Sequence, residues 1–284
     1  MLLQTMGKIN LYTHKYKFHA DEVVGCAMLL SVSPSTKIEN ITRIDYDERP
    51  SFGLRDFVLD VCRKYDAIRF FDHHQNEIKK DGTDKATAGL VYKFLVDNYY
   101  IEDFKDLRDL VKMVDDNDVG YVPAAFGTLP DIINKMNSYD INNDDLQFEA
   151  FAKAVNFVKD LIDNMLKVNK VNQERIKNTK KMLENTTPVN GVVYLTTYPT
   201  GWRDIILEQT IDADIIAWYN ESKDQYCAQV IPKEKDSFEP KGRALCWDEE
   251  GVSNDEIVFV HKGNFYVAAK TKEALLEYIE KYAK

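Results

Sequence analysis

Histidines and aspartates gather at four points of the 284-residue chain, each directly after a run of apolar residues. The apolar runs cover residues 11–13, 57–59, 70–71 and 111–114. The residues that follow them are His14, His19, Asp21, Asp60, Asp72, His73, His74 and Asp115, with Asp116 and Asp118 close behind. Four of the chain's five histidines belong to this set, which indicates one shared site rather than separate packing roles.

The residue types of this set indicate the chemistry. Imidazole and carboxylate ligands without thiolate suit Mn²⁺ and tolerate Co²⁺, whereas Mg²⁺ prefers oxygen ligands alone. An aspartate shared between two cations can bridge them, and two ions about 3.5–4 Å apart can activate water and clamp a phosphoryl oxygen. We therefore expect two divalent metal ions, Mn²⁺ first with Mg²⁺ or Co²⁺ as alternatives, and hydrolysis at phosphorus.

Strand-like and helix-like segments alternate in the first third of the chain. Strands are predicted over residues 9–13, 41–45, 57–59 and 68–71, and helices over 21–30, 87–99 and 104–115. This alternation favours a mostly parallel sheet with helices on its faces. In such a sheet the residues just beyond the strands' carboxyl ends converge on one crevice. Three strand ends and one helix end would thus bring the histidines and aspartates together.

The remaining chain predicts two further parts. Residues 145–184 contain no Pro or Gly and carry apolar residues at helical spacing, which predicts a long helix or helix pair. The basic residues of its distal part form either a solvated face or a nucleic-acid surface. Strands are then predicted over 192–195, 215–219, 226–231, 257–260 and 265–268, and a closing helix over 271–282, capped by Thr271.

We therefore expect an α/β protein in three parts. Residues 1–140 form a metal-binding catalytic domain, with a mostly parallel sheet flanked by helices. Residues 141–187 form a long helical connector. Residues 188–284 form a smaller α+β domain that binds the substrate.

Several motifs resemble a known family. The triplet Asp72-His73-His74 resembles the signature of the DHH superfamily of metal-dependent phosphoesterases. Residues 13–22, THKYKFHADE, resemble the pattern TH-xxx-FH-x-DE of the MYG (melanocyte proliferating gene) family within it. Residues 71–75 and 88–92 match its FDHHQ and AGLVY segments, and residues 114–120 resemble its IDxxDxG segment. The resemblance covers nearly the whole chain and implies a DHH-type N-terminal domain.

The resemblance also implies roles for individual residues. Six of them would be metal ligands: His14 and His19 for one ion, Asp21, His73 and Asp115 for the other, and Asp60 as the bridge. His74 would contact the scissile phosphate, and Asp72 would orient the two neighbouring histidines. Whether Asp115, Asp116 or Asp118 is the ligand stays open.

Members of the family are similar to exonucleases acting on RNA. The resemblance therefore implies a metal-dependent phosphodiesterase, a 3′–5′ exonuclease whose substrate is single-stranded RNA, a short oligonucleotide or a nucleotide. Two alternatives stay open. One is a small-molecule phosphohydrolase acting on pyrophosphate or a cyclic dinucleotide, and the other is a catalytically silent nucleotide-binding protein.

The residues that hold the substrate are harder to find, because the chain lacks the GGGH motif of the common DHH-associated substrate domain. The candidates are Arg243, His261, Thr87, Trp202 and Arg203. Arginine suits phosphate recognition, and an indole ring can stack on a base. Thr87 could donate to phosphate at the start of a helix or simply cap it. For each candidate, an ordinary packing or surface role is the alternative.

The composition of the chain limits the kinds of partner that it can bind. The net charge of −10 excludes the broad basic field of a non-specific nucleic-acid binder. The apolar runs are too short for a membrane span, and the first residues lack the apolar region of a signal peptide. The four scattered cysteines are expected to be reduced. These features predict a cytoplasmic protein without a membrane partner, and a homo-oligomer stays open.

Overall fold

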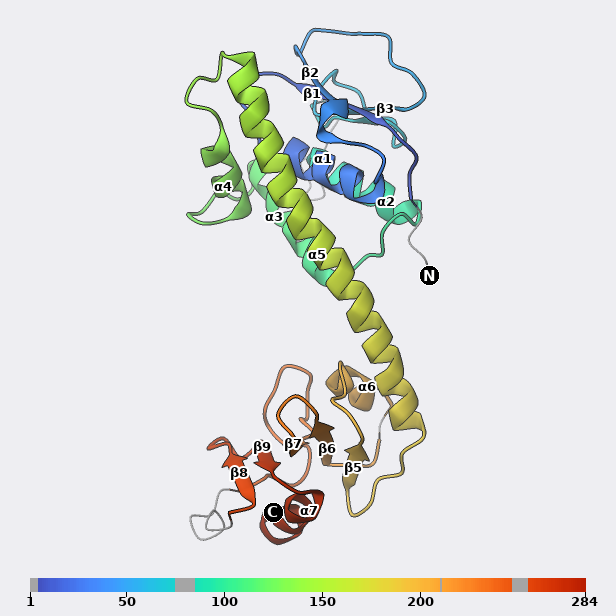
Figure 1. Ribbon diagram of the computed structural model, residues 1–284, viewed down its shortest axis with the longest axis vertical. Helices are drawn as coiled ribbons and strands as arrows, with labels where there is room; N and C mark the ends of the chain where they lie inside the picture. The colour runs from blue at the N-terminus through green and yellow to red at the C-terminus, as the bar shows by residue number, and fades with distance from the viewer. Residues whose placement is uncertain (1–4, 75–84, 210, 247–254) are drawn as a thin grey trace. The chain divides into compact units, whose positions relative to one another are not determined.

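The structure is a computed structural model, and it describes residues 5–74, 85–209, 211–246 and 255–284 (Figure 1). The chain forms two compact units, Met1–Asn169 and Lys170–Lys284. Helix α5 (Asp144–Glu184) contributes its first part to one unit and its last part to the other. The long helix expected in this region is thus confirmed as one continuous helix. The three-part division into residues 1–140, 141–187 and 188–284 stays a prediction.

The first unit is built on a four-stranded sheet of order β2-β1-β3-β4. Its strands are β1 (Asn10–His14), β2 (Ile41–Ile44), β3 (Asp56–Leu59) and β4 (Phe70–Phe71), and every pair is parallel. Leu11 of β1 lies opposite Ile41 on one side and Phe57 on the other. Strand β3 is buried at every position, as expected for a parallel strand covered on both faces. The predicted parallel sheet is confirmed.

Helices surround this sheet. They are α1 (Ala20–Val32), α2 (Thr87–Asp97), α3 (Lys105–Asp118) and α4 (Leu129–Met136), with a short 3₁₀ turn η1 (Ile38–Asn40) before β2. Helix α1 is buried on nearly every side because it packs against the sheet, α2 and α3. A Cβ atom on its Gly25 would lie only 2.9 Å from Leu59 Cδ2, so glycine permits this close approach. Helix α4 was not predicted from the sequence, and it has Pro130 in its first turn.

The core of the first unit joins the sheet to α1 and α5. Leu11, Leu59 and Phe71 from the strands are almost fully buried in it. Phe18, just before α1, meets Phe151 of α5 edge to face at 5.6 Å. This contact packs the residues just before α1 against α5, close to the polar residues at the start of α1.

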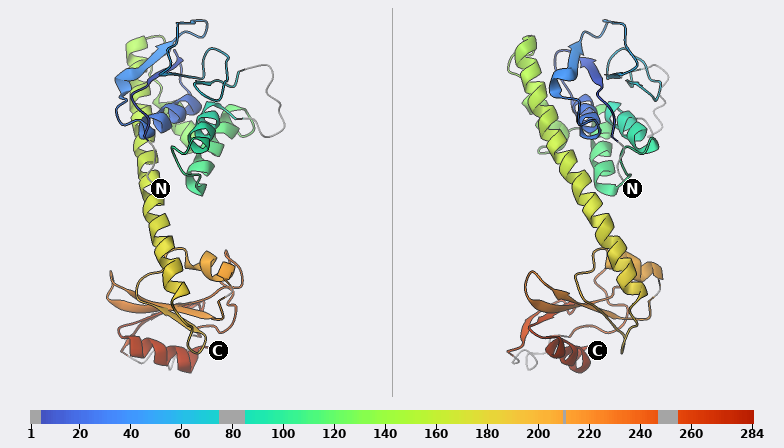
Figure 2. Two further views of the ribbon diagram at one scale, coloured as in Figure 1. Left: turned by 90° about the vertical axis from the view of Figure 1, so that its right-hand side faces the viewer. Right: turned by 45° about the vertical axis from the view of Figure 1, so that its right-hand side comes forward.

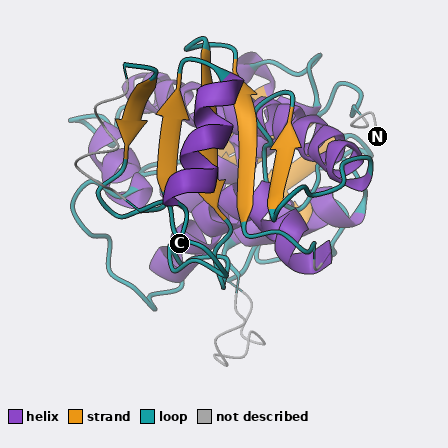
Figure 3. Ribbon diagram, turned by 90° about the horizontal axis from the view of Figure 1, so that it is seen from below, coloured by secondary structure: helices purple, strands orange, loops and turns teal. Residues whose placement is uncertain are grey.

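The second unit has a five-stranded mixed sheet of order β5-β6-β7-β9-β8. Its strands are β5 (Val192–Leu195), β6 (Ile215–Asn220), β7 (Gln225–Val230), β8 (Ile257–Val260) and β9 (Tyr266–Ala269). The β5–β6 pair is parallel and the others are antiparallel. Helix α7 (Lys272–Tyr282) covers one face, and α6 (Trp202–Gln209) with the end of α5 covers the other (Figures 2 and 3).

Alternation along β6 builds two cores in this unit. Ile215 and Ala217 belong to the core under α7, while Ile216 and Trp218 belong to the core under α6. Thr271 caps α7 as predicted, because its side chain accepts a hydrogen bond from Ala274 N at 3.2 Å. The expected α+β architecture is confirmed.

In the described part of the chain, no helix combines the length and hydropathy needed to cross a membrane.

Candidate metal centre

The candidate site lies where the strand order of the first sheet reverses. From β1 the chain moves to β2 on one side, and later returns to β3 on the other side of β1. Such a reversal leaves a crevice at the carboxyl ends of the two central strands. His14 is the last residue of β1 and Asp60 follows β3, and His14 Nε2 lies 3.3 Å from Asp60 Oδ2.

Three overlapping groups of potential metal ligands occupy this crevice. Within each group the ligand atoms lie within 4.8 Å of one another. The groups are His14, His19, Glu22 and Asp60; Asp60, His73 and His74; and His19, Asp21 and Asp118. Asp60 belongs to the first and second groups, and His19 to the first and third. The arrangement therefore has the shared carboxylate that a site for two cations needs.

The first turn of α1 supplies three of these side chains. His19 is the N-cap residue, and Asp21 and Glu22 follow in the first turn, where the helix dipole stabilises carboxylates. The Glu22 carboxylate accepts a hydrogen bond from His19 N at 3.0 Å and lies 3.0 Å from His14 Nε2. Sequence reasoning gave Glu22 no role. Its position beside Asp21 in the THKYKFHADE motif was the available signal.

Asp60 sits on unusual backbone. Its φ is +52°, and Cys62 and Arg63 follow with φ of +80° and +50°. Left-handed backbone is disfavoured for residues with a Cβ and persists where its surroundings hold it. Asp72 holds the backbone after Asp60 in this conformation. Its Oδ2 accepts a hydrogen bond from Arg63 N at 2.6 Å, and its Oδ1 accepts one from His74 N at 2.8 Å. Asp72 thus ties the loop after β3 to the loop after β4.

Several buried polar atoms in the crevice lack hydrogen bonds. Neither carboxylate oxygen of Asp21 forms one with the described residues. The Nε2 atoms of His14 and His73 lie 3.0 Å from carboxylate oxygens of Glu22 and Asp118 without forming one. Burial, and then Asp60 and Asp118, raise the pKa of Asp21 well above its ordinary value. Unpaired buried polar groups are costly unless something else satisfies them. A divalent cation among these atoms would do so, and the donor set fits it.

His14 is oriented to present one particular nitrogen. Its Nδ1 lies 2.8 Å from Lys15 O, and a carbonyl oxygen can only accept, so Nδ1 carries a proton. Tyr46 stacks on the imidazole ring at 4.8 Å with an interplanar angle of 15°. Nε2 therefore points to Glu22 and Asp60, as in a metal-binding histidine whose other nitrogen is held by the backbone.

The carboxylates of the crevice raise the pKa of two of its histidines. Burial lowers the pKa of His14, but the carboxylates of Glu22 and Asp60 outweigh it and raise that pKa to about 10. Burial likewise lowers the pKa of His73, and Asp118 and Asp60 together raise it to about 9. The carboxylates thus attract positive charge strongly enough to overcome the desolvation of two imidazoles.

His74 differs from the other histidines because its side chain is 52% exposed. Its Nδ1 lies 3.1 Å from Asp72 Oδ1 and 3.2 Å from Asp60 Oδ1. These two carboxylates raise the pKa of His74 to about 10. The residue is therefore a held, cationic side chain that borders the crevice and remains open to solvent.

The structure separates the three acids at the end of α3. Asp115 Oδ1 accepts from Gly89 N at 2.8 Å, and a Cβ on Gly89 would lie only 1.9 Å from Asp115 Oδ2. Asp116 forms an ion pair with Lys112 at 2.6 Å. Asp118 Oδ2 lies 3.0 Å from His73 Nε2, and Asp118 alone of the three belongs to a ligand group. The geometry favours Asp118 over Asp115.

Thr87 begins α2 beside the crevice and is fully buried. Its hydroxyl donates to Phe71 O at 3.0 Å and lies 3.4 Å from Asp60 Oδ1. The N-cap residue of α2 is Ala86, and no side chain caps this helix. Thr87 therefore fixes the edge of β4 next to Asp60, and its expected contact with phosphate stays a prediction.

The four other substrate candidates belong to the second unit. Arg243 forms a bidentate ion pair with Asp214 at 2.7 and 2.9 Å. Trp202 is 4% exposed, and Arg203 lies over its ring. His261 packs on Phe265 with ring centroids 4.0 Å apart. Each residue thus has a local structural contact, and its role toward a substrate stays a prediction.

Known proteins resemble this chain at several levels. It is 23% identical over 327 residues to a MYG1 protein of Saccharomyces cerevisiae, and 26% identical over 282 residues to a MYG1 protein of Chlamydia muridarum. Each match covers 93% of both chains. Among solved structures it is similar to the pGpG-specific phosphodiesterase PggH of Vibrio cholerae, with 14% identity and a TM-score of 0.33, over 96% of this chain and 99% of that one. This structural likeness is too low to transfer an activity.

The family itself is shown by a match along nearly the whole chain. Residues 10–282 match the sequence model of the MYG1_exonuc family, described as an uncharacterised protein family (UPF0160). This range includes every ligand group of the crevice. The resemblance seen in the motifs is confirmed, and the chain belongs to the MYG1 family.

Proposed function

We propose that this chain is a metal-dependent phosphoesterase that hydrolyses phosphodiester bonds with two divalent ions, Mn²⁺ in preference to Mg²⁺ or Co²⁺. One observation carries the proposal. The three ligand groups, two of which share Asp60, contain buried atoms of Asp21, His14 and His73 that form no hydrogen bond. A fold does not usually bury so many unsatisfied groups at a strand edge without a ligand to satisfy them.

The ligands divide between two ions. The first ion would be held by His14, His19 and Glu22. The second ion would be held by Asp21, His73 and Asp118, and Asp60 would bind both ions. When bound, the ions would acidify a water molecule and neutralise charge on the phosphate. Asp118 replaces Asp115 in this assignment, because the Asp115 carboxylate already accepts the Gly89 amide.

His74 and Asp72 would act on the substrate side. His74 is exposed at the crevice, and Asp72 and Asp60 hold its Nδ1. The opposite ring nitrogen can then donate a hydrogen bond or a proton to the scissile phosphate or the leaving oxygen. Asp72 also accepts the amide hydrogen of His74, so it fixes both the ring and the backbone of this residue.

The substrate class follows from the family resemblance and the charge of the chain. We propose single-stranded RNA or a short oligonucleotide, cut in the 3′–5′ direction. A net charge of −10 disfavours long duplexes, whose binding depends on many cationic contacts. A crevice with several carboxylates would admit the phosphodiester backbone of an oligonucleotide only where metal ions compensate the repulsion.

The test is Mn²⁺-supported hydrolysis of a substrate panel. The panel contains 5′-labelled single-stranded RNA and DNA, a dinucleotide, a cyclic dinucleotide and pyrophosphate. We expect a ladder of shortened RNA that disappears in the His73→Ala variant. The Asp116→Asn variant is the matched control, since Asp116 pairs with Lys112 outside the ligand groups. Cleavage of only pyrophosphate or the cyclic dinucleotide would refute the RNA assignment, and no Mn²⁺-dependent turnover at all would refute the phosphoesterase.

A further inference from the structure

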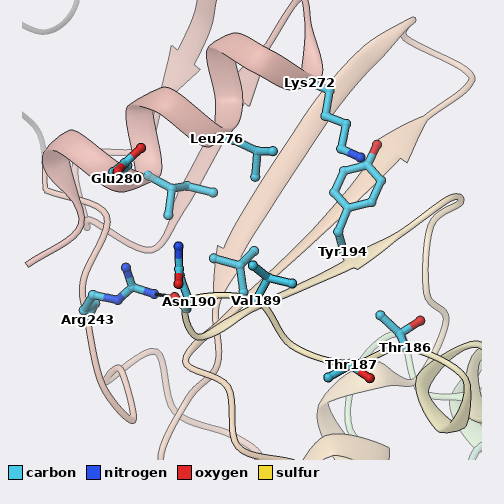
Figure 4. A pocket seen from close by; sticks show the side chains of 11 residues that line it. Thr186, Thr187, Val189, Asn190, Tyr194, Arg243, Lys272, Leu276 and Glu280 are labelled. Atoms are coloured by element: carbon cyan, nitrogen blue, oxygen red, sulfur yellow. Dashed lines mark hydrogen bonds between the residues drawn. The ribbon is translucent and has the colours of Figure 1, made fainter.

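The second unit contains an open groove made of two adjoining pockets. The larger, of about 560 Å³, lies between α7 and residues 186–194 (Figure 4). The smaller, of about 340 Å³, reaches the end of α5 and shares Thr186 and Tyr194 with the larger. We call the two together the α7 groove. The larger pocket alone has the volume of an ordinary small-molecule site.

The floor of the α7 groove is apolar. Leu276 and Ile279 face it from α7, and Val189 and Val192 face it from the turn before β5 and from the strand itself. Val189 is 69% exposed and Leu276 is 37% exposed, so this apolar surface is not covered by the described residues. An exposed apolar floor inside a concave site is typical of a binding surface for a flat or apolar group.

Two lysines border the groove without an anionic partner. Lys272 lies over the Tyr194 ring, with Nζ 3.9 Å from the ring centroid (Figure 4). Lys181 lines the smaller pocket, to which Tyr194 also contributes. Neither forms an ion pair with a described residue, so both charges are available to an anionic ligand.

Arg243 forms a wall of the groove rather than a free cation. Its guanidinium donates to both Asp214 oxygens and to Asn190 O. Asn190 and Gly191 have φ of +50° and +76°, and the ion pair holds this turn in place. A Cβ on Gly191 would lie 2.7 Å from Asp214 Oδ1, so glycine is needed there. The charge of Arg243 is therefore neutralised locally.

The ends of the groove differ in charge. Glu280 lies two turns after Lys272 on α7, about 12 Å away at 1.5 Å per residue. Figure 4 shows the two side chains at opposite ends of the larger pocket. The cationic end continues into the smaller pocket, where Asn185 and Thr196 add polar groups. An anion therefore fits at the Lys272–Tyr194–Lys181 end, and an apolar or aromatic group fits over the floor.

We propose that the α7 groove binds a segment of single-stranded oligonucleotide, with phosphates at Lys272 and Lys181 and a base over the apolar floor beside Tyr194. Cations that follow a strand backbone, combined with an aromatic ring, are the general means of binding single strands. The proposal rests on the proposed function for its ligand class. It adds a binding site that does not use the metal ligands.

Binding can be measured with metal chelated. Fluorescence anisotropy of a fluorescein-labelled single-stranded RNA pentamer, in EDTA and at several salt concentrations, reports on binding without turnover. We expect Lys272→Met and Lys181→Met each to weaken binding about five- to tenfold and to reduce the slope of log K against log salt by about 0.7, one phosphate contact. Lys223→Met, an exposed lysine in the turn between β6 and β7, is the matched control and should bind within twofold of the native chain.

Three outcomes would overturn the proposal. The two groove variants could bind like the native chain, or Lys223→Met could weaken binding as much as they do. The groove could also take another apolar anion, so that laurate displaces an environment-sensitive dye and oligonucleotide does not.

The proposed function is tested separately by Mn²⁺-supported hydrolysis of bis(p-nitrophenyl) phosphate, which is too small to need the groove. Unaltered hydrolysis by the lysine variants, together with their weakened RNA binding, supports the groove. Lysine-dependent RNA binding by a native chain that hydrolyses nothing would leave the groove standing and refute the phosphoesterase.

Discussion

Replacing Asp21 by asparagine should raise stability without metal and remove most of the stabilisation that metal gives the native chain. The carboxylate is fully buried, and neither oxygen has a hydrogen-bond partner among the described residues. Burial, and then Asp60 and Asp118, raise its pKa. The metal-free fold therefore either buries a charge that accepts no hydrogen bond, with His73 Nε2 4.0 Å away, or holds a proton there at a cost. The amide has the same shape, carries no charge and can donate to the neighbouring carboxylates of Asp60 and Asp118, so the metal-free protein should become more stable.

The size of the gain follows from the cost of a buried, unsatisfied group. That cost is about 1–3 kcal/mol, and it is larger when the group is charged. For a unit of this size, about 2–4 °C of melting temperature corresponds to each kcal/mol, so the Asp21→Asn variant should melt about 2–12 °C above the native chain in EDTA. With Mn²⁺ at 100 times its Kd, the native chain gains about 2.7 kcal/mol, which the variant should largely lose.

The pH dependence has a definite sign. A carboxyl with a raised folded pKa contributes stability that is present below its unfolded pKa and is lost as pH rises toward the folded value. For Asp21 the loss begins near pH 4 and continues upward. The metal-free difference between variant and native chain should therefore be larger at pH 8 than at pH 5.

Scanning calorimetry in EDTA and in MnCl₂, at both pH values, measures these shifts. Asp116→Asn is the control, since it removes a half-buried acid that pairs with Lys112 outside the ligand groups. An Asp21→Asn variant that melts below the native chain in EDTA, or that keeps the full Mn²⁺ shift, would refute the reasoning about this carboxylate.

Three further predictions concern two other residues of the crevice and one ion pair of the second unit. Asp118→Asn should weaken Mn²⁺ binding at least about 10- to 100-fold in calorimetric titration, which is the loss usual when a residue that only supports a metal ligand is removed. Asp116→Asn should bind Mn²⁺ within twofold of the native chain. His74→Ala should lower kcat about 10²–10⁴-fold while Mn²⁺ affinity stays within twofold; equal losses in both would make His74 a ligand. Burial raises the pKa of Asp214, but Arg243 outweighs it and lowers that pKa, so this pair stabilises the fold above about pH 4 and less as pH falls further. Arg243→Met should therefore destabilise the chain most near neutral pH in urea melts, and a difference that grows in acid would contradict this.

The sheet and most of the crevice were predictable because strand ends carry their own signals. Apolar runs predicted β1 and β3, and the rule of converging carboxyl ends placed His14 and Asp60 together, as the structure confirms. This inference needed only alternation of strands and helices. It did not require knowing the strand order, because both strands end at the same edge of a parallel sheet.

The choice among the acids of α3 could not be made from sequence. Asp115 and Asp118 are three residues apart on one helix and so lie on the same face. What separates them is the close approach of Gly89, from another helix, to the Asp115 carboxylate. Glu22 was missed for a related reason. A Glu three residues after an N-cap is expected to accept a hydrogen bond from the cap amide, as it does here. This local role gives no sign that the same carboxylate also lies beside His14.

The second unit was predictable in its strands and less so in its contacts. Helix α6 was missed because it is only eight residues long and begins with the Trp202-Arg203 pair, whose residue types suggested a ligand contact. Asp214 and Arg243 are 29 residues apart, so no local pattern announces their ion pair. Helix α6 and the Asp214–Arg243 ion pair both depend on tertiary contacts rather than on local sequence propensity.

The central claim is that one crevice holds two metal ions through a shared Asp60. Calorimetric titration of Mn²⁺ into chelator-treated native protein and into Asp60→Ala tests it most directly. We expect two Mn²⁺ ions per native chain and loss of tight binding of both in the variant, because Asp60 belongs to two of the ligand groups. A single ion per native chain, or two ions bound equally well by Asp60→Ala, would contradict it.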